Sequence, residues 1–299
     1  MKTARFQRLA DRARGQPAAA VVAVVMAVVM AVVMAVMMAG GLTACSSTST
    51  TTPRSSSARP AEQPRAAAPS TDPVDVERRA RVRLELASAY FSRGQTDTAL
   101  DEVKLSIAAK PDLAEAYNLQ GLIYAALNED GLAEESFSRA LRINPRDGQT
   151  LHNQGWFLCQ RDRFTEAQAQ FAAALAIPQY REVARTHLAR GVCHGRNQQW
   201  IEAEAALMRA YELEPSNPST GLNLADVLVR RGEFERARFY IGRVNDTPGN
   251  VNAQTLWLAA RIEHKLGQTS SLRVLGDRLR QGFAQSPEAA LFERGRFDD

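Results

Sequence analysis

Residue types that carry chemistry are scarce in this sequence. Its 299 residues include three cysteines and four histidines, and it has no glycine-rich loop of the kind that holds phosphates. His187 and His194 share one predicted helix with Cys193, but a metal site needs ligands that converge on one point. Cys159 has no neighbouring base that would activate it as a nucleophile. These shortages argue against an enzyme, and we expect no metal, no other cofactor and no small-molecule substrate.

Large apolar residues are missing from residues 46–73, which consist mainly of serine, threonine, proline, alanine and arginine. Such a composition cannot bury enough apolar surface to fold on its own. We therefore expect residues 45–75 to form a flexible, disordered linker. It separates an N-terminal segment, residues 1–44, from the body of the chain.

The N-terminal segment has the layout of an export signal. A basic start precedes an unbroken run of alanine, valine and methionine from Ala18 to Ala39, and Leu-Thr-Ala-Cys follows at 42–45. This layout resembles a bacterial lipoprotein signal peptide, in which a cysteine after small residues receives the lipid. The resemblance implies that residues 1–44 are removed and that Cys45 is lipidated. A plain transmembrane anchor is the alternative, because the apolar run is long enough to span a bilayer.

Without residues 1–44, the chain has no excess of positive or negative charge. The whole chain has 37 Lys and Arg against 33 Asp and Glu, but residues 1–44 hold five of the basic residues and one of the acidic ones. The remaining chain has 32 of each. A balanced chain lacks the basic excess that attracts nucleic acid, so we expect no nucleic-acid partner.

A 34-residue repeat runs from about residue 80 to about residue 280. Small residues let two helices approach closely, large apolar residues fill the space between them, and a proline ends the second helix. The pattern is clearest in the second unit, where the marking residues are Tyr117, Gly121, Tyr124, Ala133, Phe137, Ala140 and Pro145. It resembles the tetratricopeptide repeat, a helix-turn-helix unit that stacks into a superhelix.

This pattern predicts an all-α fold. We expect a tetratricopeptide-repeat superhelix of about six helix-turn-helix units over residues 76–285, followed by a C-terminal tail at 286–299. No stretch of the body alternates as a strand does. The second helix of the sixth unit, at about Ser271 to Phe283, lacks the small residues of the pattern, so we expect it to cap the stack.

The first helix of each unit lines the concave face in tetratricopeptide arrays, and partners usually bind there. The large apolar residues at these positions suit an amphipathic helix or an extended peptide, and one asparagine stands where an amide often holds a ligand's backbone. The alternative is that neighbouring units cover some of these positions. The predicted groove residues are Leu84, Phe91, Asn118, Leu122, His152 and Trp156.

Two cysteines remain besides Cys45. The repeat places Cys159 in the first helix of the third unit and Cys193 in the first helix of the fourth, and these helices should be neighbours. An oxidising compartment permits a disulfide between them. Two buried, unpaired thiols are the alternative.

The order of the parts and two strings point to a family. The strings are Asn-Gln-Gly-Trp-Phe-Leu-Cys at 153–159 and Leu-Asn-Leu-Ala at 222–225. With the signal peptide, the linker and six units, they resemble the type IV pilus biogenesis and stability lipoprotein family, often called PilW or PilF. The resemblance implies an outer-membrane pilotin, a lipid-anchored scaffold facing the periplasm. Its partners would be outer-membrane lipid and the type IV pilus secretin subunit, which it would help to reach the membrane and multimerise.

A second interpretation fits the same architecture. It is an envelope lipoprotein adaptor that docks peptidoglycan hydrolases or outer-membrane assembly factors, and the identity of the bound partner would separate the two. Ser46 follows Cys45 directly. By analogy with the lipoproteins that the chain resembles, a serine there favours the outer membrane.

Overall fold

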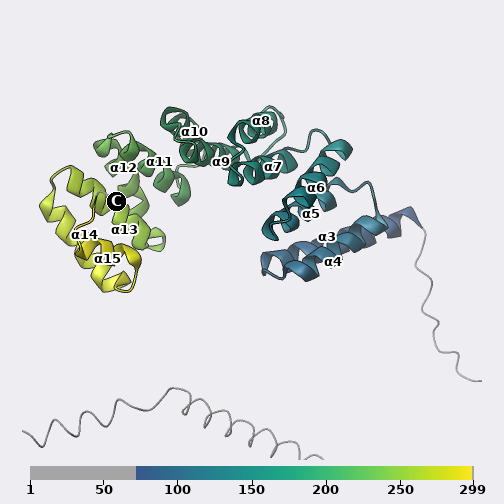
Figure 1. Cartoon of the computed structure of the whole chain (residues 1–299), viewed down its shortest axis with the longest axis horizontal. Coiled ribbons are helices and arrows are strands. Elements are labelled where there is room, and N and C mark those ends of the chain that lie inside the picture. Colours follow the sequence, from purple (N-terminus) through teal and green to yellow (C-terminus); the bar gives the residue numbers. More distant parts are fainter. Residues whose placement is uncertain (1–71, 298–299) are drawn as a thin grey trace, which may run out of the picture. The chain divides into compact units, whose positions relative to one another are not determined.

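Residues 72–297 are described by a computed structural model, and within that range the chain is helical throughout (Figure 1). The range holds thirteen α-helices, one 3-10 helix and no strand, which confirms the all-α prediction. The predicted signal peptide, Cys45 and nearly all of the linker lie outside it. The elements are α3 (Pro73–Ser92), α4 (Thr96–Ala109), α5 (Ala114–Ala126), α6 (Asp130–Ile143), α7 (Gly148–Gln160), α8 (Phe164–Leu175), α9 (Val183–Arg196), α10 (Trp200–Leu213), α11 (Pro218–Arg230), α12 (Phe234–Asn245), η1 (Pro248–Asn250), α13 (Ala253–Lys265), α14 (Thr269–Phe283) and α15 (Pro287–Glu293).

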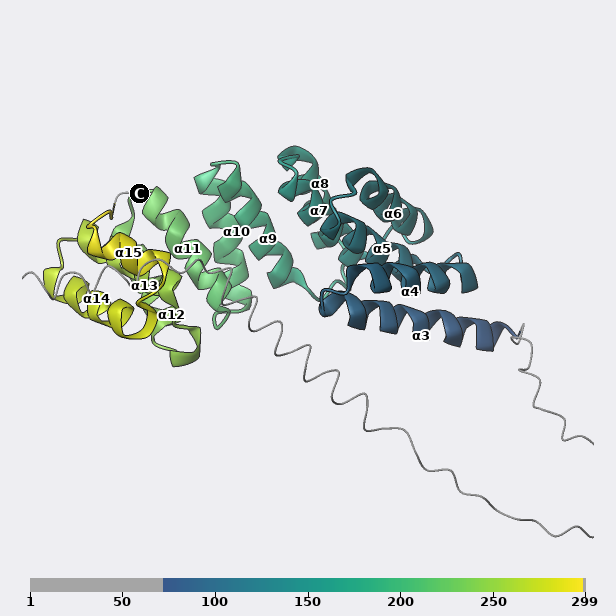
Figure 2. The same ribbon diagram turned by 60° about the horizontal axis from the view of Figure 1, so that its bottom comes forward.

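Successive helices form six hairpins, as the repeat predicts. A three-residue turn joins α3 to α4, α5 to α6, and so on to α13 and α14. Each second helix packs on the first helix of the next hairpin, and neighbouring first helices also contact each other (Figure 2). None of the helices in residues 72–297 is both long and apolar enough to cross a membrane.

Close approach within the second to fifth hairpins depends on a glycine in the first helix. A Cβ atom on Gly121 would lie 2.7 Å from the ring of Phe137, and one on Gly191 would lie 2.6 Å from Leu207. Phe137 and Leu207 are fully buried. The small residue therefore creates the space that the large residue of the second helix fills, which is the packing that the 34-residue pattern predicts.

The turn inside every hairpin has the same backbone conformation. Its middle residue has a positive φ, between 56° and 76°, in all six units. Single residues in this left-handed region reverse the chain direction after a helix. These residues are Gly94, Asn128, Asp162, Gln198, Gly232 and Gly267.

The hydrophobic core runs along the stack. One cluster joins α3, α4 and α5, a second joins α5 through α9, and a third joins α9 through α13. Each hairpin thus buries its apolar side chains against its neighbours, as expected for a repeat array.

The array begins slightly earlier than predicted. The Asp72 side chain accepts a 2.8 Å hydrogen bond from the Val74 amide, and this cap starts α3 at Pro73. Val82 and Leu86 on α3 are 49% and 39% exposed. Within the described residues no hairpin precedes α3, so its outer face remains uncovered.

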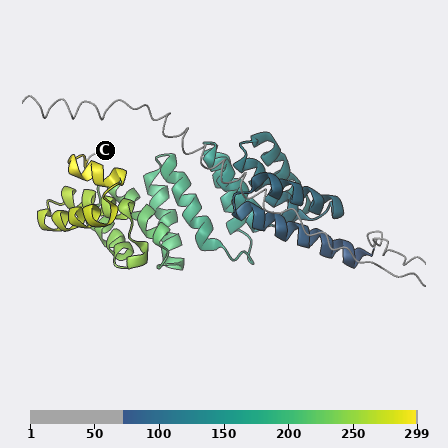
Figure 3. The same ribbon diagram turned by 90° about the horizontal axis from the view of Figure 1, so that it is seen from below.

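The segment expected to be a C-terminal tail, residues 286–299, contains a further helix. Residues 287–293 form α15, which packs on α13 and α14 at the end of the stack (Figure 3). Gly276 of α14 lies against Phe292, and a Cβ there would sit 2.4 Å from the ring. The second helix of the sixth unit therefore keeps a small residue, and α15 rather than α14 covers the end.

Candidate functional site: a pocket on the first helices

An open pocket of about 500 Å³ lies on the surface built by the first helices α5, α7 and α9. It spans the second, third and fourth units. The residues that line it are Leu122, Ala125, Ala126, Asn128, Asn153, Trp156, Phe157, Gln160, Arg161 and Arg196.

Two of the predicted groove residues, Leu122 and Trp156, line this pocket together. Both are half-buried and rest on the core cluster beneath, which includes Phe137 and Phe157. Each side chain thus has one face held by the core and the other open. An aromatic residue held in this way is suited to anchor an apolar side chain of a partner.

Leu84 and Phe91 do not join them. They are half-buried on α3 and pack against the first core cluster, where Val103 and Ile123 are fully buried. Neither lines the pocket around Trp156. The structure therefore divides the four apolar groove residues into two pairs.

Asn118 and His152, two of the predicted groove residues, are buried between units and are not exposed on the groove surface. Asn118 is 7% exposed, and its Oδ1 accepts a 3.1 Å hydrogen bond from Nδ2 of Asn153. His152 is 4% exposed, and its Nδ1 lies 2.8 Å from Oγ1 of Thr186. Both side chains join their own unit to the next, because unsatisfied polar groups are costly when buried.

Sequence reasoning missed Asn153 as a pocket residue. It lies in the floor of the pocket and is fixed by the hydrogen bond to Asn118. The signal was available, because the two asparagines are 35 residues apart, one more than the repeat length. That offset places both on the facing sides of adjacent first helices.

Ion pairs between units border the pocket. Arg161 donates to Asp130 at 2.6 Å and lies 5.2 Å from the ring centroid of Phe157, and Arg196 donates to Asp162 at 3.0 Å. The hydrogen bond from Arg161 lowers the pKa of Asp130. These arginines are already paired, so the pocket itself presents mainly apolar and amide groups.

A disulfide joins Cys159 of α7 to Cys193 of α9. The two Cα atoms are 5.8 Å apart, within the range that a disulfide bridges without moving the backbone. Both cysteines are fully buried, next to the pocket floor. The bridge ties together the two units that carry Trp156 and Arg196.

The remaining histidines do not form a reactive site. His194 is buried, and its Nδ1 lies 2.8 Å from Oε1 of Gln199. His187 is half-buried on the same helix, where burial and then Arg190 lower its pKa. In the described part of the chain, no three His, Cys, Asp or Glu side chains are grouped so that they could hold a metal ion.

Comparison with known proteins agrees with this architecture. The family model of the tetratricopeptide repeat matches residues 114–147, the second unit. The type IV pilus assembly protein PilF of Pseudomonas aeruginosa is 25% identical over 210 residues, which cover 70% of this chain and 83% of PilF.

Two solved structures are similar along the whole array. The crystal structure of PilW, described as a widely conserved type IV pilus biogenesis factor, has a TM-score of 0.66 at 28% identity and covers 71% of this chain and 96% of PilW. The structure of Pseudomonas aeruginosa PilF has a TM-score of 0.66 at 24% identity, and the match covers 74% of this chain and 99% of the PilF chain.

The chain is a tetratricopeptide-repeat protein. Its homologues are the PilF and PilW proteins of type IV pilus biogenesis.

Proposed function

We propose that this chain is an outer-membrane lipoprotein, a pilotin, that binds the type IV pilus secretin subunit and promotes its localisation and multimerisation. The pocket around Trp156 carries the proposal, because it offers an aromatic anchor site on the surface that such arrays use for partners. The homologues support a role in type IV pilus biogenesis and an association with the cell envelope. The chain acts as a binding scaffold rather than as an enzyme.

Lipid at Cys45 would supply the membrane affinity, at about 0.8 kcal/mol per buried methylene. The array would hold an apolar segment of the secretin subunit in the pocket while the lipoprotein is sorted. Tethering also raises the local concentration of subunits, which favours ring assembly. The Cys45→Ala variant should therefore fold but leave the outer-membrane fraction.

Trp156→Ala tests the pocket. The full chain should lose secretin binding by about 30-fold, because a buried aromatic anchor typically contributes 2 kcal/mol or more to an interface. Co-purification with the secretin subunit and the amount of ring in outer-membrane fractions measure the effect. Phe239→Ala is the matched control, since Phe239 is 55% exposed on α12 and outside the pocket.

Equal secretin binding by wild type, Trp156→Ala and Phe239→Ala would show that the pocket is not the secretin site. Co-purification of a peptidoglycan hydrolase or an outer-membrane assembly factor in place of secretin would instead establish the adaptor function.

A further inference from the structure

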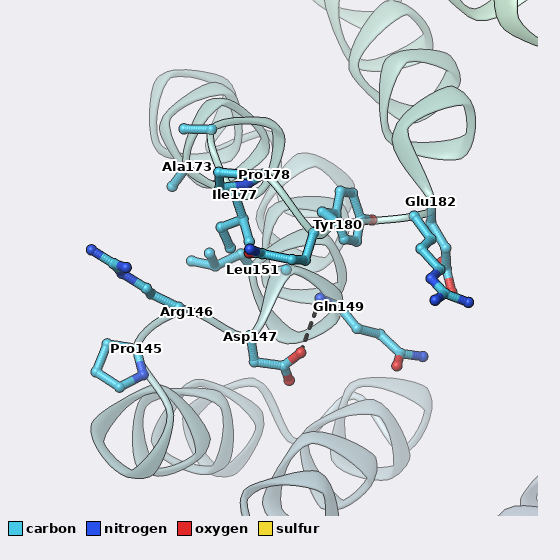
Figure 4. A pocket seen from close by; sticks show the side chains of 14 residues that line it. Pro145, Arg146, Asp147, Gln149, Leu151, Ala173, Ile177, Pro178, Tyr180 and Glu182 are labelled. Atoms are coloured by element: carbon cyan, nitrogen blue, oxygen red, sulfur yellow. Dashed lines mark hydrogen bonds between the residues drawn. The ribbon is translucent and has the colours of Figure 1, made fainter.

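A second pocket lies where the second helix of one unit leads into the first helix of the next. It has a volume of about 850 Å³ and is lined by the connections at 145–149 and 176–182 and by part of α8 (Figure 4). None of the predicted groove residues lines it. It is therefore separate from the pocket around Trp156, and the inference below does not depend on the proposed secretin binding.

A long connection creates this pocket. Seven residues, 176–182, join α8 to α9, as many as join α12 to α13, whereas four join α4 to α5, α6 to α7 and α10 to α11. The additional residues carry Tyr180 onto Gly148, where a Cβ would lie 2.4 Å from the ring. The Tyr180 hydroxyl shares a 2.6 Å hydrogen bond with Thr186, which also contacts His152. The connection is thus held at its centre, and the pocket wall that it forms is fixed.

The inner part of the pocket is apolar. It is formed by Leu151, Ala173, Ile177, Pro178 and the ring of Tyr180, and Figure 4 shows these side chains from α7, α8 and the connection gathered together. Only Leu151 among them is fully part of the core, at 7% exposed. A large apolar side chain from outside could therefore cover this surface.

The two carboxylates of the lining are already engaged within the chain. Asp147 accepts hydrogen bonds from the amides of Gln149 and Thr150 and so caps α7. Glu182 pairs with Arg185, one turn further along. Both carboxylates keep their negative charge, but their hydrogen bonds hold them to partners within the chain.

The two arginines of the lining are not engaged in this way. Arg146 and Arg181 are exposed and make no ion pair with any residue in the range 72–297. Figure 4 shows Arg146 on one side of the pocket and Glu182 on the other. Among the charged side chains of the lining, these two arginines are therefore the ones that can still pair with carboxylates of a partner.

We propose that this pocket binds an extended acidic segment of a partner protein. One large apolar side chain of the segment covers Leu151, Ala173 and Ile177, and carboxylates on either side of it pair with Arg146 and Arg181. Guanidinium groups bind carboxylates with two parallel hydrogen bonds, which gives both orientation and affinity. The apolar anchor supplies the buried area, and the charges select the sequence around it.

The first test uses a fluorescein-labelled peptide, Gly-Ser-Glu-Glu-Phe-Glu-Glu-Ser-Gly, and the purified full chain in detergent, with anisotropy as the readout. The peptide should bind saturably and more weakly as salt rises. Versions with lysine in place of glutamate, or serine in place of phenylalanine, should bind at least tenfold more weakly. A lack of saturable binding, or equal binding of the three peptides, overturns the proposal.

Charge reversal then locates the site. Arg146→Glu with Arg181→Glu should weaken binding of the acidic peptide at least tenfold. Arg273→Glu with Arg278→Glu, two exposed residues on α14, changes the net charge equally and should leave binding unchanged. An equal loss in both double variants would mean that the peptide senses only overall charge, which contradicts the proposal.

A filled pocket gives an independent measurement. Ala173 and Ala172 are both exposed on α8, but only Ala173 lines the pocket. Ala173→Trp should abolish peptide binding, whereas Ala172→Trp should retain it, and circular dichroism should show both folded. If Trp156→Ala abolishes binding while Ala173→Trp retains it, the peptide occupies the first-helix pocket and the proposal is wrong.

Discussion

Single residues that join adjacent units carry much of the specificity of this fold, and His152 is the most informative. Burial is the main cause that lowers its pKa from 6.5 to about 4, and Arg185 adds to the effect. The ring is therefore neutral at pH 7 and can share its hydrogen bond with Thr186.

The His152 pKa predicts a specific loss of stability in acid. An unfolded chain binds the proton near pH 6.5 and the folded chain near pH 4, so the unfolded state holds more protons between these values. The contribution of His152 to the free energy of unfolding is complete above pH 6.5. It falls as the pH drops through this window, by roughly 2 to 3 kcal/mol at pH 4.5.

Urea unfolding at pH 7 and pH 4.5 should show this difference, and His152→Gln should remove it. His187→Gln should remove less, because that ring is only half-buried. The same pH dependence in wild type and His152→Gln would refute the assignment.

For Asn118 and His152, the sequence predicted the helix but not whether the side chain is exposed. The repeat register places both residues in first helices, and the structure has them there, in α5 and α7. It could not show that Asn153 and Thr186, contributed by the next unit, would cover them. Exposure at a lining position depends on the size and polarity of a side chain about 34 residues away, and the spacing of one unit does not contain that information.

Local sequence signals that recur in each unit determine where the helices and turns lie. The turn inside each hairpin is an example. The middle turn residue is in the left-handed region in every unit, but the fourth unit places Gln198 there, with φ 56°. Glutamine is disfavoured in this region, whereas glycine adopts it freely.

Gln198→Gly should therefore stabilise the array by about 1 kcal/mol. Asn197→Gly, one residue earlier at φ −85°, relieves no unfavourable conformation and should destabilise it instead, because glycine gains entropy in the unfolded chain. Thermal melts of the two variants decide the matter. A lower melting temperature for Gln198→Gly would show that other contacts hold the turn.

The hairpins could be predicted from sequence because each one carries the same marks, but α15 could not be found in that way. Its seven residues have no repeat pattern, and its packing on Gly276 and Leu256 involves contacts that no periodicity encodes. A local signal did exist. Ser286 caps the Ala289 amide at 3.1 Å, and Pro287 follows it at the first helical position.

The molecule as a whole is cross-linked at one place among the described residues, between its third and fourth units. The disulfide closes a loop of 34 residues, and a loop of that length stabilises a fold by roughly 3 to 4 kcal/mol in the chain-entropy model. Cys159→Ala with Cys193→Ala should lower the free energy of unfolding by this amount. Cys45→Ala is the control and should leave it unchanged, since Cys45 takes no part in this disulfide. Mass spectrometry without reductant should find the wild-type protein two hydrogens lighter than its reduced form, and two free thiols would contradict the bridge.

The unequal covering of the two ends of the stack has a consequence for the order in which it opens. Repeat arrays unfold locally, and a terminal unit has a neighbour on one side only. Val82 and Leu86 leave the α3 end exposed, whereas α15 closes the other end over Leu256 and Leu279. Backbone amides of α3 and α4 should therefore exchange with deuterium first, those of α13 and α14 later, and those of α7 and α9, held by the disulfide, last. The N-terminal end of the array would then be its most readily opened part.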